Sequence, residues 1–282
     1  MTWLLSSISS ALFDSFKLLA IKDKVDKECN EYFIAFIVAL FTSVISLVPT
    51  LFLDSQIFTP EADYLLALAI VVSINLITLI LTTQANNYSD LSTLAPLYSF
   101  SPLFVALTAF FILGEKINTI GFLGIALVVS GTFVVNKNKK DRYFKNINID
   151  LGQLMIILST ILWSISSVYF KVGMNKSSSF GFVFVVYSLI SIILFIVIMF
   201  KKVKIKESFQ KVVNVGLTSA FTSIFQWYAV SIGPTAYVLA IKRASSVFSV
   251  IWGKLFLKEK NFIPRIFGAL IIFIGVMLIV YA

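Results

Sequence analysis

Apolar stretches of similar length follow one another along this sequence, separated by short polar segments. Each stretch holds roughly 18–23 residues, the length that an α-helix needs to cross a hydrocarbon core about 30 Å thick. The pattern therefore predicts an all-α integral membrane protein with ten transmembrane helices. We expect them at Trp3–Ile21, Tyr32–Leu53, Tyr64–Thr83, Leu91–Gly114, Ile117–Val135, Leu151–Val172, Phe180–Phe200, Val212–Gly233, Thr235–Leu257 and Phe262–Tyr281.

Two features subdivide this pattern. Pro96 and Pro102 lie in the fourth stretch, and proline bends or breaks a helix because it lacks a backbone donor. The longest connection, Asn136–Asp150, is polar and basic and divides the chain nearly in half. We therefore assign residues 1–136 to a first five-helix repeat, 137–150 to a basic connecting loop and 151–282 to a second five-helix repeat.

The two halves repeat each other at a constant spacing. Phe104-Val-Ala-Leu and Leu113-Gly-Glu-Lys in the first half match Phe248-Ser-Val-Ile and Leu257-Lys-Glu-Lys in the second. The same offset of 144 positions relates Gly124 to Gly268 and Gly131 to Gly275. Because five spans per half is an odd number, the second half must begin on the opposite face of the membrane. The repeat is therefore inverted, as in many secondary carriers, whose sites lie near the midplane between the halves.

The segments Ser101-Pro-Leu-Phe-Val-Ala-Leu, Leu113-Gly-Glu-Lys and Gly121-Phe-Leu-Gly-Ile-Ala-Leu-Val-Val-Ser-Gly, with their counterparts after Leu257, carry a resemblance. The sequence resembles EamA-type members of the drug/metabolite transporter superfamily. The ten-span organisation covers the whole chain, and the sequence match is sharpest in spans four, five, nine and ten. The resemblance implies a 5+5 carrier of small metabolites, amino acids or drugs, often working outward.

The composition agrees with a membrane protein and disfavours a nucleic-acid partner. Only 13% of the residues are charged and the mean hydropathy is +0.95, whereas soluble domains average about 25% charged residues. The net charge of +9 lies in the short loops, so it sets topology and does not indicate a nucleic-acid partner. The N-terminus lacks a basic region and a cleavage site, so we interpret it as the first span and not as a signal peptide.

Several motifs of catalysis and cofactor binding are missing from the sequence. There is no histidine, and Cys29 is the only cysteine, so we expect no metal site and no intramolecular disulfide. Neither a Walker-type glycine loop nor a nucleophilic serine motif is found. We therefore expect no cofactor, and we disfavour an ATP-driven pump and most membrane enzymes.

The basic residues of the loops are distributed unevenly between the two sides. Loops after spans one, five, seven and nine carry Lys22, Lys24, Lys27, Lys137, Lys139, Lys140, Arg142, Lys145, Lys201, Lys202, Lys204, Lys206, Lys211, Lys258, Lys260 and Arg265. The other side has Lys116, Lys171 and Lys176, and the loop after span two is acidic. The positive-inside rule then predicts both termini outside the cell membrane, whereas the resemblance implies both termini in the cytoplasm.

Lys242 and Arg243 form the sharpest candidate for substrate binding. Lys242 lies eight residues past Pro234, about 12 Å into the ninth span at 1.5 Å per residue. Ionisable residues at such depth are costly in lipid and usually face a cavity or a partner. Fixed cations favour a carboxylate or phosphate, and the pair resembles the phosphate-binding pair of plastid sugar-phosphate translocators. The alternatives are snorkelling to the headgroups or pairing with an internal acid.

Asp14 and Lys17 in the first span are the candidates for proton coupling. A desolvated carboxylate in a span is able to exchange a proton because burial raises its pKa. The alternative is an intrahelical ion pair with Lys17 at i+3, which we favour slightly. Glu115 and Glu259 lie at turns between helices and are expected to contact neighbouring helix ends or lysines.

Polar residues at a spacing of three or four mark one face of spans one, three, six, eight and nine. Each face alone is compatible with close helix packing, and together they suggest a shared polar interior. Aromatic residues could also line this interior. The candidate substrate-binding residues, in addition to Lys242 and Arg243, are Tyr98, Ser245, Gln226, Asn75, Ser164, Trp163 and Tyr237.

The sequence favours a secondary transporter that moves a small anionic or zwitterionic metabolite, such as an amino acid, an organic acid or a phosphorylated compound. It would work by alternating access, coupled to protons or by exchange. One alternative is a membrane enzyme or scaffold acting on lipid-linked substrates, and another is efflux of hydrophobic cations. The expected partners are a small-molecule substrate, the lipid bilayer of the cell membrane and a second copy of the chain, with the oligomeric state left open.

Overall fold

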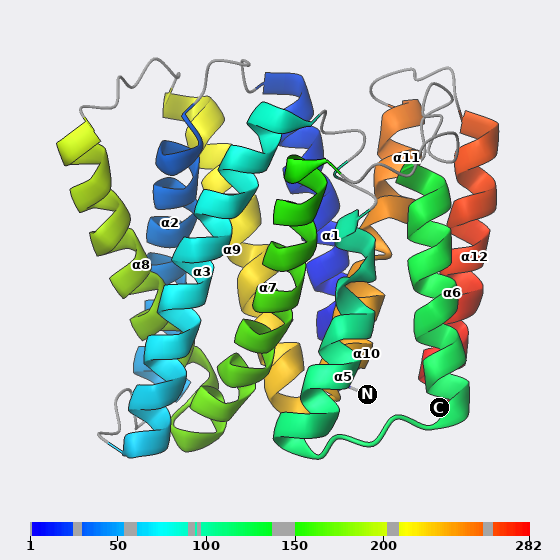
Figure 1. Cartoon of the computed structure of the whole chain (residues 1–282), viewed down its shortest axis with the longest axis horizontal. Coiled ribbons are helices and arrows are strands. Elements are labelled where there is room, and N and C mark those ends of the chain that lie inside the picture. The colour runs from blue at the N-terminus through cyan, green and yellow to red at the C-terminus, as the bar shows by residue number, and fades with distance from the viewer. Residues whose placement is uncertain are drawn as a thin grey trace. The chain divides into compact units, whose positions relative to one another are not determined.

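The computed structural model describes residues 2–24, 30–53, 61–89, 94, 97–136, 150–201, 209–255 and 262–282. All regular elements in these ranges are helices, as the apolar pattern predicts (Figure 1). They are α1 Thr2–Lys24, α2 Glu31–Leu53, α3 Ala62–Tyr88, η1 Leu97–Phe100, α5 Ser101–Leu113, α6 Thr119–Asn136, α7 Leu151–Lys176, α8 Ser179–Lys201, α9 Phe209–Ile232, α10 Thr235–Lys242, α11 Ser245–Leu255 and α12 Phe262–Val280.

Several of these helices have the length and composition of membrane spans. Within the described residues, four are long and apolar enough to cross a membrane: Glu31–Phe52, Ala62–Ala85, Leu151–Lys176 and Ser179–Lys201. Large apolar side chains on their surfaces are exposed, including Phe52 and Phe200 at 83% and 85%, as expected of side chains that face lipid. The protein is therefore a multi-pass helical membrane protein. The connecting loop at 137–149 and the basic loop segments at 25–29, 202–208 and 256–261 lie outside the described residues.

The fourth and ninth predicted spans are each interrupted. In the fourth, the short η1 precedes α5, which agrees with the expected effect of the prolines. The ninth was expected as one helix, but α10 ends at Lys242 and α11 begins at Ser245. The chain tightens there, because the N–H groups of Arg243 and Ala244 bond to carbonyls only three residues earlier, at 2.9 Å each. Ser101 and Ser245, which begin α5 and α11, are related by the offset of 144.

The helices form two compact units, and each unit takes segments from both halves of the sequence. The first contains Met1–Val72 and Tyr169–Gly233, and the second contains Ser73–Val168 and Pro234–Ala282. The unit boundaries cut α3 after Val72 and α7 after Val168. The compact units and the sequence repeat therefore divide the chain differently.

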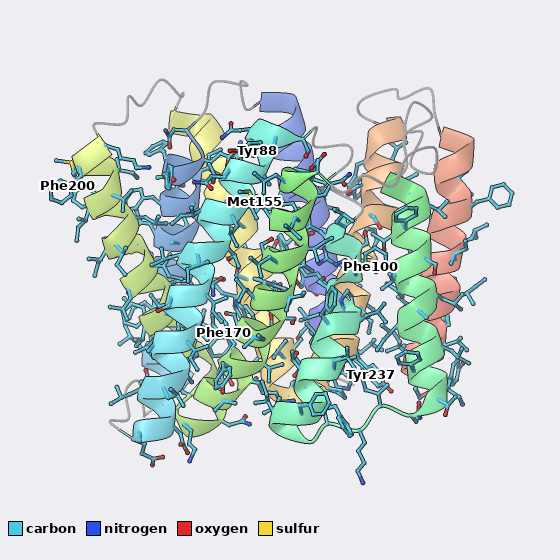
Figure 2. The ribbon with its side chains drawn as sticks, in the orientation of Figure 1. Tyr88, Phe100, Met155, Phe170, Phe200 and Tyr237 are labelled. Carbon is cyan, nitrogen blue, oxygen red and sulfur yellow. The ribbon has the colours of Figure 1, made fainter. Side chains whose placement is uncertain are left out.

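In the first unit, α1 packs against α9, and α2 packs against α8 and α9. Ser10 Oγ donates to the Thr222 carbonyl at 3.0 Å, and Ser43 Oγ lies 2.6 Å from Ser188 Oγ. Phe170, labelled in Figure 2, is fully buried. It stacks on Trp227 with ring centroids 3.8 Å apart. These contacts join helices through small polar side chains and aromatic stacking.

In the second unit, α6 and α12 lie side by side (Figure 1) and meet through the repeated glycines. A Cβ on Gly131 would lie 2.7 Å from the Gly268 carbonyl oxygen, and one on Gly124 would lie 2.8 Å from that of Gly275. Gly124 of α6 thus meets Gly275 of α12, and Gly131 meets Gly268, so the two helices are antiparallel. This reciprocal pattern is that of a contact across a two-fold axis.

The parts of α3 and α7 that belong to the second unit are also antiparallel neighbours. Asn75 Nδ2 donates to Ser166 Oγ at 2.9 Å, and a Cβ on Gly152 would lie 2.8 Å from the Ala85 carbonyl oxygen. At the end of this pair, Ser89 Oγ donates to Asp150 Oδ1 at 2.5 Å. The Ser89 hydroxyl lowers the pKa of the Asp150 carboxyl. Small and polar residues therefore fix the contact between these helices.

Candidate substrate site

The charged pair lies at the end of a short buried helix. Pro234, with extended backbone, precedes α10, whose residues from Thr235 to Ile241 are all buried. Lys242 is the last residue of α10, and Arg243 follows it in the turn before α11. Both residues are partly buried. The sequence placed them inside a continuous helix, but the structure puts them at a helix break.

Arg243 connects the two interrupted spans. Its Nη2 donates a short hydrogen bond to Ser101 Oγ at the start of α5. Ser101 is only 1% exposed, and proline in the first turn of α5 supports a helix start there. The two breaks, 142 residues apart in sequence at this contact, therefore meet within the second unit. Cationic side chains beside helix starts are a setting that favours anions.

Glu115 joins the other ends of the same two helices. Gly114 ends α5 with φ of 67°, a left-handed conformation that suits glycine. The carboxylate of Glu115 then accepts hydrogen bonds from the Thr235 N–H at 2.8 Å and from Thr235 Oγ1 at 2.9 Å. A carboxylate at a helix N-terminus satisfies free donors and complements the helix dipole. The expected contact of Glu115 with a neighbouring helix end is confirmed, and Glu259 lies outside the described residues.

Removing this carboxylate is expected to destabilise the protein. Glu115→Ala leaves the buried donors of Thr235 without their acceptor, which costs about 1–3 kcal/mol. Glu115→Gln keeps one oxygen acceptor and should lose less. The measurement is the melting temperature of the purified protein, and Lys116→Ala, at the exposed neighbouring position, is the control. Equal melting temperatures for Glu115→Ala and Lys116→Ala would contradict this role.

Three further candidates lie in the helices around the break. Tyr98, in η1, packs against the buried cluster of Ala85, Leu94 and Ile156. Tyr237 in α10, labelled in Figure 2, is buried. Its hydroxyl lies so close to the Gly121 backbone that a side chain at Gly121 would overlap it. Ser245 begins α11 and is 6% exposed. These contacts give Tyr98 and Tyr237 a packing role.

The α3–α7 pair of the second unit holds the next candidates. Asn75 is bonded to Ser166, as described above. The carbonyl of Ser164 accepts a 3.5 Å hydrogen bond from Thr108 Oγ1 of α5, and the carbonyl of Trp163 accepts one from Ser167 Oγ at 2.9 Å. The second unit thus brings α7, α5 and α10 into one neighbourhood.

The remaining candidates lie in the first unit. Lys17 Nζ and Asp14 Oδ1 form an ion pair at 3.1 Å, with side chains 29% and 13% exposed. This agrees with the favoured interpretation of the pair. Gln226 in α9 is 3% exposed, and Lys171 Nζ donates to the Gly233 carbonyl just after α9, at 2.7 Å.

Many serines and threonines of the predicted polar faces are buried, and many of their hydroxyls are bonded within their own helices. Ser7 bonds to the Trp3 carbonyl at 2.7 Å, Ser164 to that of Ile161 at 2.6 Å and Thr222 to that of Thr218 at 2.8 Å. These residues are at most 2% exposed. The faces therefore point into the protein, and hydroxyls bonded in this way favour helix packing over ligand contact.

Ser99 and Ser101 were not among the candidate site residues predicted from the sequence. Serine is common in membrane helices, so neither position stood out by type. The signal was available in the repeat, because the offset of 144 places Ser99 opposite Arg243 and Ser101 opposite Ser245.

Comparison with known proteins identifies the family of this chain. The profile of the EamA-like transporter family matches residues 1–137 and again 150–281. The chain belongs to the EamA-like transporter family. The resemblance seen in the sequence is thereby confirmed, and the EamA-like family consists of membrane transporters within the drug/metabolite transporter superfamily.

Two further comparisons concern this EamA-family chain, one with a protein of similar sequence and one with a solved structure of similar fold. A protein of Methanocaldococcus jannaschii, named "Uncharacterized protein MJ1333.1", is 25% identical over 134 residues, which are 46% of this chain and 96% of that protein. A solved crystal structure superimposes with a TM-score of 0.81 at 13% identity, covering 98% of this chain and 95% of that chain. At that identity the superposition shows the fold alone.

Proposed function

We propose that this EamA-family protein is a secondary transporter built from two inverted five-helix repeats, and that it moves a small anionic or zwitterionic metabolite by alternating access. The observation that carries the anionic cargo is the break in the ninth span, where Arg243 follows Lys242 and bonds to Ser101 at the start of α5. The carrier then needs no resident cofactor.

The reciprocal glycine contacts support the inverted repeat. Gly124 meets Gly275 and Gly131 meets Gly268 in antiparallel helices, which is the contact that a two-fold axis in the membrane plane would produce. The family profile matches the chain twice. The relative from Methanocaldococcus jannaschii corresponds over nearly its whole length to about half of this chain. A protein of about half this length thus resembles part of this chain, which supports a chain built from two similar parts.

Charge supports an acidic group in the cargo. Arginine presents several N–H donors in a planar fork that matches a carboxylate or phosphate. The positive charge of the pair would also repel hydrophobic cations, which makes them the less favoured cargo.

A screen of compounds tests the cargo class. Purified protein is heated with metabolites of three classes, namely acidic, zwitterionic and hydrophobic cationic, and the melting temperature is recorded. A cargo at a hundred times its Kd stabilises the folded state by about 2.7 kcal/mol. We expect shifts with acidic or zwitterionic compounds. Shifts confined to hydrophobic cations would contradict the proposal.

We further propose that Asp14 serves mainly as the partner of Lys17 and not as a proton carrier. Asp14→Asn should then destabilise the protein, because it leaves the partly buried Lys17 without its 3.1 Å carboxylate partner. The double variant Asp14→Asn with Lys17→Gln should recover much of the loss. The measurement is the melting temperature of the unmodified protein, Asp14→Asn, Lys17→Gln and the double variant. Proton-dependent uptake that the double variant abolishes would assign Asp14 to coupling instead.

The uneven loop charge leads us to propose both termini outside the cell membrane. A reporter that fluoresces only in the cytosol, fused to the C-terminus, should then stay dark, and a reporter active only outside should give a signal. Matched fusions within the basic segment 137–149 should behave in the opposite way. Cytosolic fluorescence at the C-terminus would reverse this orientation.

A further inference from the structure

We infer that Ser101 and Ser99 belong to the cargo site, where, with Arg243, they hold the acidic group of the cargo, a carboxylate or a phosphate. The inference rests on the proposed function and adds two neutral hydroxyls to the charged pair from which that function was argued.

Because Arg243 donates the hydrogen bond to Ser101, the Ser101 hydroxyl is able to donate its own hydrogen to the cargo. A guanidinium has no acceptor, so Arg243 Nη2 donates and Ser101 Oγ accepts. The hydrogen of the Ser101 hydroxyl is not used in this bond. Within the described ranges, Ser101 Oγ is hydrogen-bonded only to Arg243. The guanidinium and the hydroxyl therefore act as neighbouring donors. Hydrogen bonds to an ionised acceptor are about twice as strong as those between neutral groups, which favours an anion here.

Ser99 supplies a second buried hydroxyl. It lies in η1, two residues before α5 begins, and is 1% exposed. Its Oγ is buried and has no hydrogen-bond partner among the residues that the structure describes. Buried polar atoms in native proteins are nearly always bonded, so an exception requires a reason. A bound cargo oxygen gives Ser99 an acceptor that the described residues do not provide.

The sequence repeat relates these serines to the charged side of the break. Ser99 corresponds to Arg243, and Ser101 corresponds to Ser245. Each half thus places a polar residue two positions before a helix and a serine at the helix start. Only the second half adds a charge. The contact of Arg243 with Ser101 joins the charged half to the neutral half, so an acidic group bound there would be held by both.

The test measures how strongly the simplest anions stabilise the purified full-length protein. Sodium acetate and sodium phosphate are titrated separately to about 100 mM at constant ionic strength, and the melting temperature is recorded. A saturable rise with acetate indicates a carboxylate site, and one with phosphate a phosphate site. We expect Ser101→Ala to weaken the apparent anion affinity about tenfold, which is about 1.4 kcal/mol. Ser99→Ala should weaken it by a similar or smaller factor, and Ser101→Thr, which keeps the hydroxyl, should restore it.

The matched control is Ser159→Ala in α7. Ser159 is 2% exposed and bonds to the Ile156 carbonyl of its own helix at 2.9 Å, so its loss should leave anion affinity unchanged. The anion-dependent shift separates ligand contact from stability, since a variant that is merely less stable starts lower but shifts equally. Should Ser101→Ala fail to fold, Ser101→Cys, with similar volume and a weaker donor, replaces it.

Three other outcomes of the anion titration would contradict this inference, and one of them would also contradict the anionic cargo. Unchanged anion affinity in both alanine variants, together with loss in Arg243→Gln, overturns this inference and leaves the charged pair intact. Tighter binding in Ser101→Ala also overturns it, because the hydroxyl would then compete with the anion for Arg243. No saturable shift with either anion in the unmodified protein overturns the anionic cargo and this inference together.

Discussion

Replacing Arg243 with glutamine is expected to reduce transport about thirtyfold or more while the protein still folds and inserts. Truncating one partner of a buried charge pair costs about 2–5 kcal/mol, and each 1.4 kcal/mol is about a factor of ten. The glutamine amide remains able to donate to Ser101 Oγ, the present partner of Arg243, so the helix break should persist. Uptake of a compound found by the metabolite screen, measured in proteoliposomes, gives the rate.

Three companion variants make this result specific. Arg243→Lys keeps the charge but loses the planar fork, so its rate should fall between those of the unmodified protein and Arg243→Gln. Lys242→Gln should also lose transport. Lys116→Gln removes a positive charge from an exposed turn and should transport normally. Full activity in both Arg243→Gln and Lys242→Gln would remove the charged pair from the mechanism.

Placing leucine at Gly131 is expected to prevent assembly of the second unit. Even a Cβ there would lie 2.7 Å from the Gly268 carbonyl oxygen and 2.8 Å from the Ile272 backbone nitrogen. Because both close atoms belong to the backbone of α12, the helices themselves would have to separate. Overpacking a well-packed core costs about 1–3 kcal/mol and sometimes more, so Gly131→Ala should be measurably destabilised and Gly131→Leu should give no monodisperse protein.

The control for this prediction is the neighbouring position. Ser130 is exposed on the same helix, so Ser130→Leu should be tolerated. The reciprocal contact also predicts that Gly268→Ala costs about as much as Gly131→Ala. The double alanine variant should cost less than the two single losses added together, since both disturb one contact. Size-exclusion profiles and melting temperatures measure these effects, and an unaffected Gly131→Leu would contradict the helix contact.

The helices were predictable because each apolar stretch has the length that a helix needs to cross the membrane. The break in the fourth span was marked by Pro102, but the turn at Arg243 and Ala244 contains neither proline nor glycine. That break is set by the tertiary environment, so the sequence shows it only through the correspondence of Ser245 with Ser101. The local sequence pattern therefore did not predict the helix break at Arg243 and Ala244, the position that matters most for the proposed site.

Contacts between distant segments account for the other differences. The repeat marked the glycines of α6 and α12, yet the pairing of Gly131 with Gly268 depends on the antiparallel packing of the helices. The contact of Arg243 with Ser101 likewise joins residues that no local spacing relates. By contrast, the ion pair of Asp14 with Lys17 follows from helical spacing within a single helix and was foreseeable.

The central claim, carriage of a small acidic metabolite, is tested most directly by exchange of an isotope-labelled metabolite extract. Proteoliposomes loaded with unlabelled extract are placed in labelled extract, and the labelled compounds inside are identified by mass spectrometry. The account predicts that one or a few acidic or zwitterionic compounds accumulate unchanged, and that they do not accumulate with Arg243→Gln. Accumulation of hydrophobic cations alone, or chemical conversion of a compound with no labelled material inside, would contradict it.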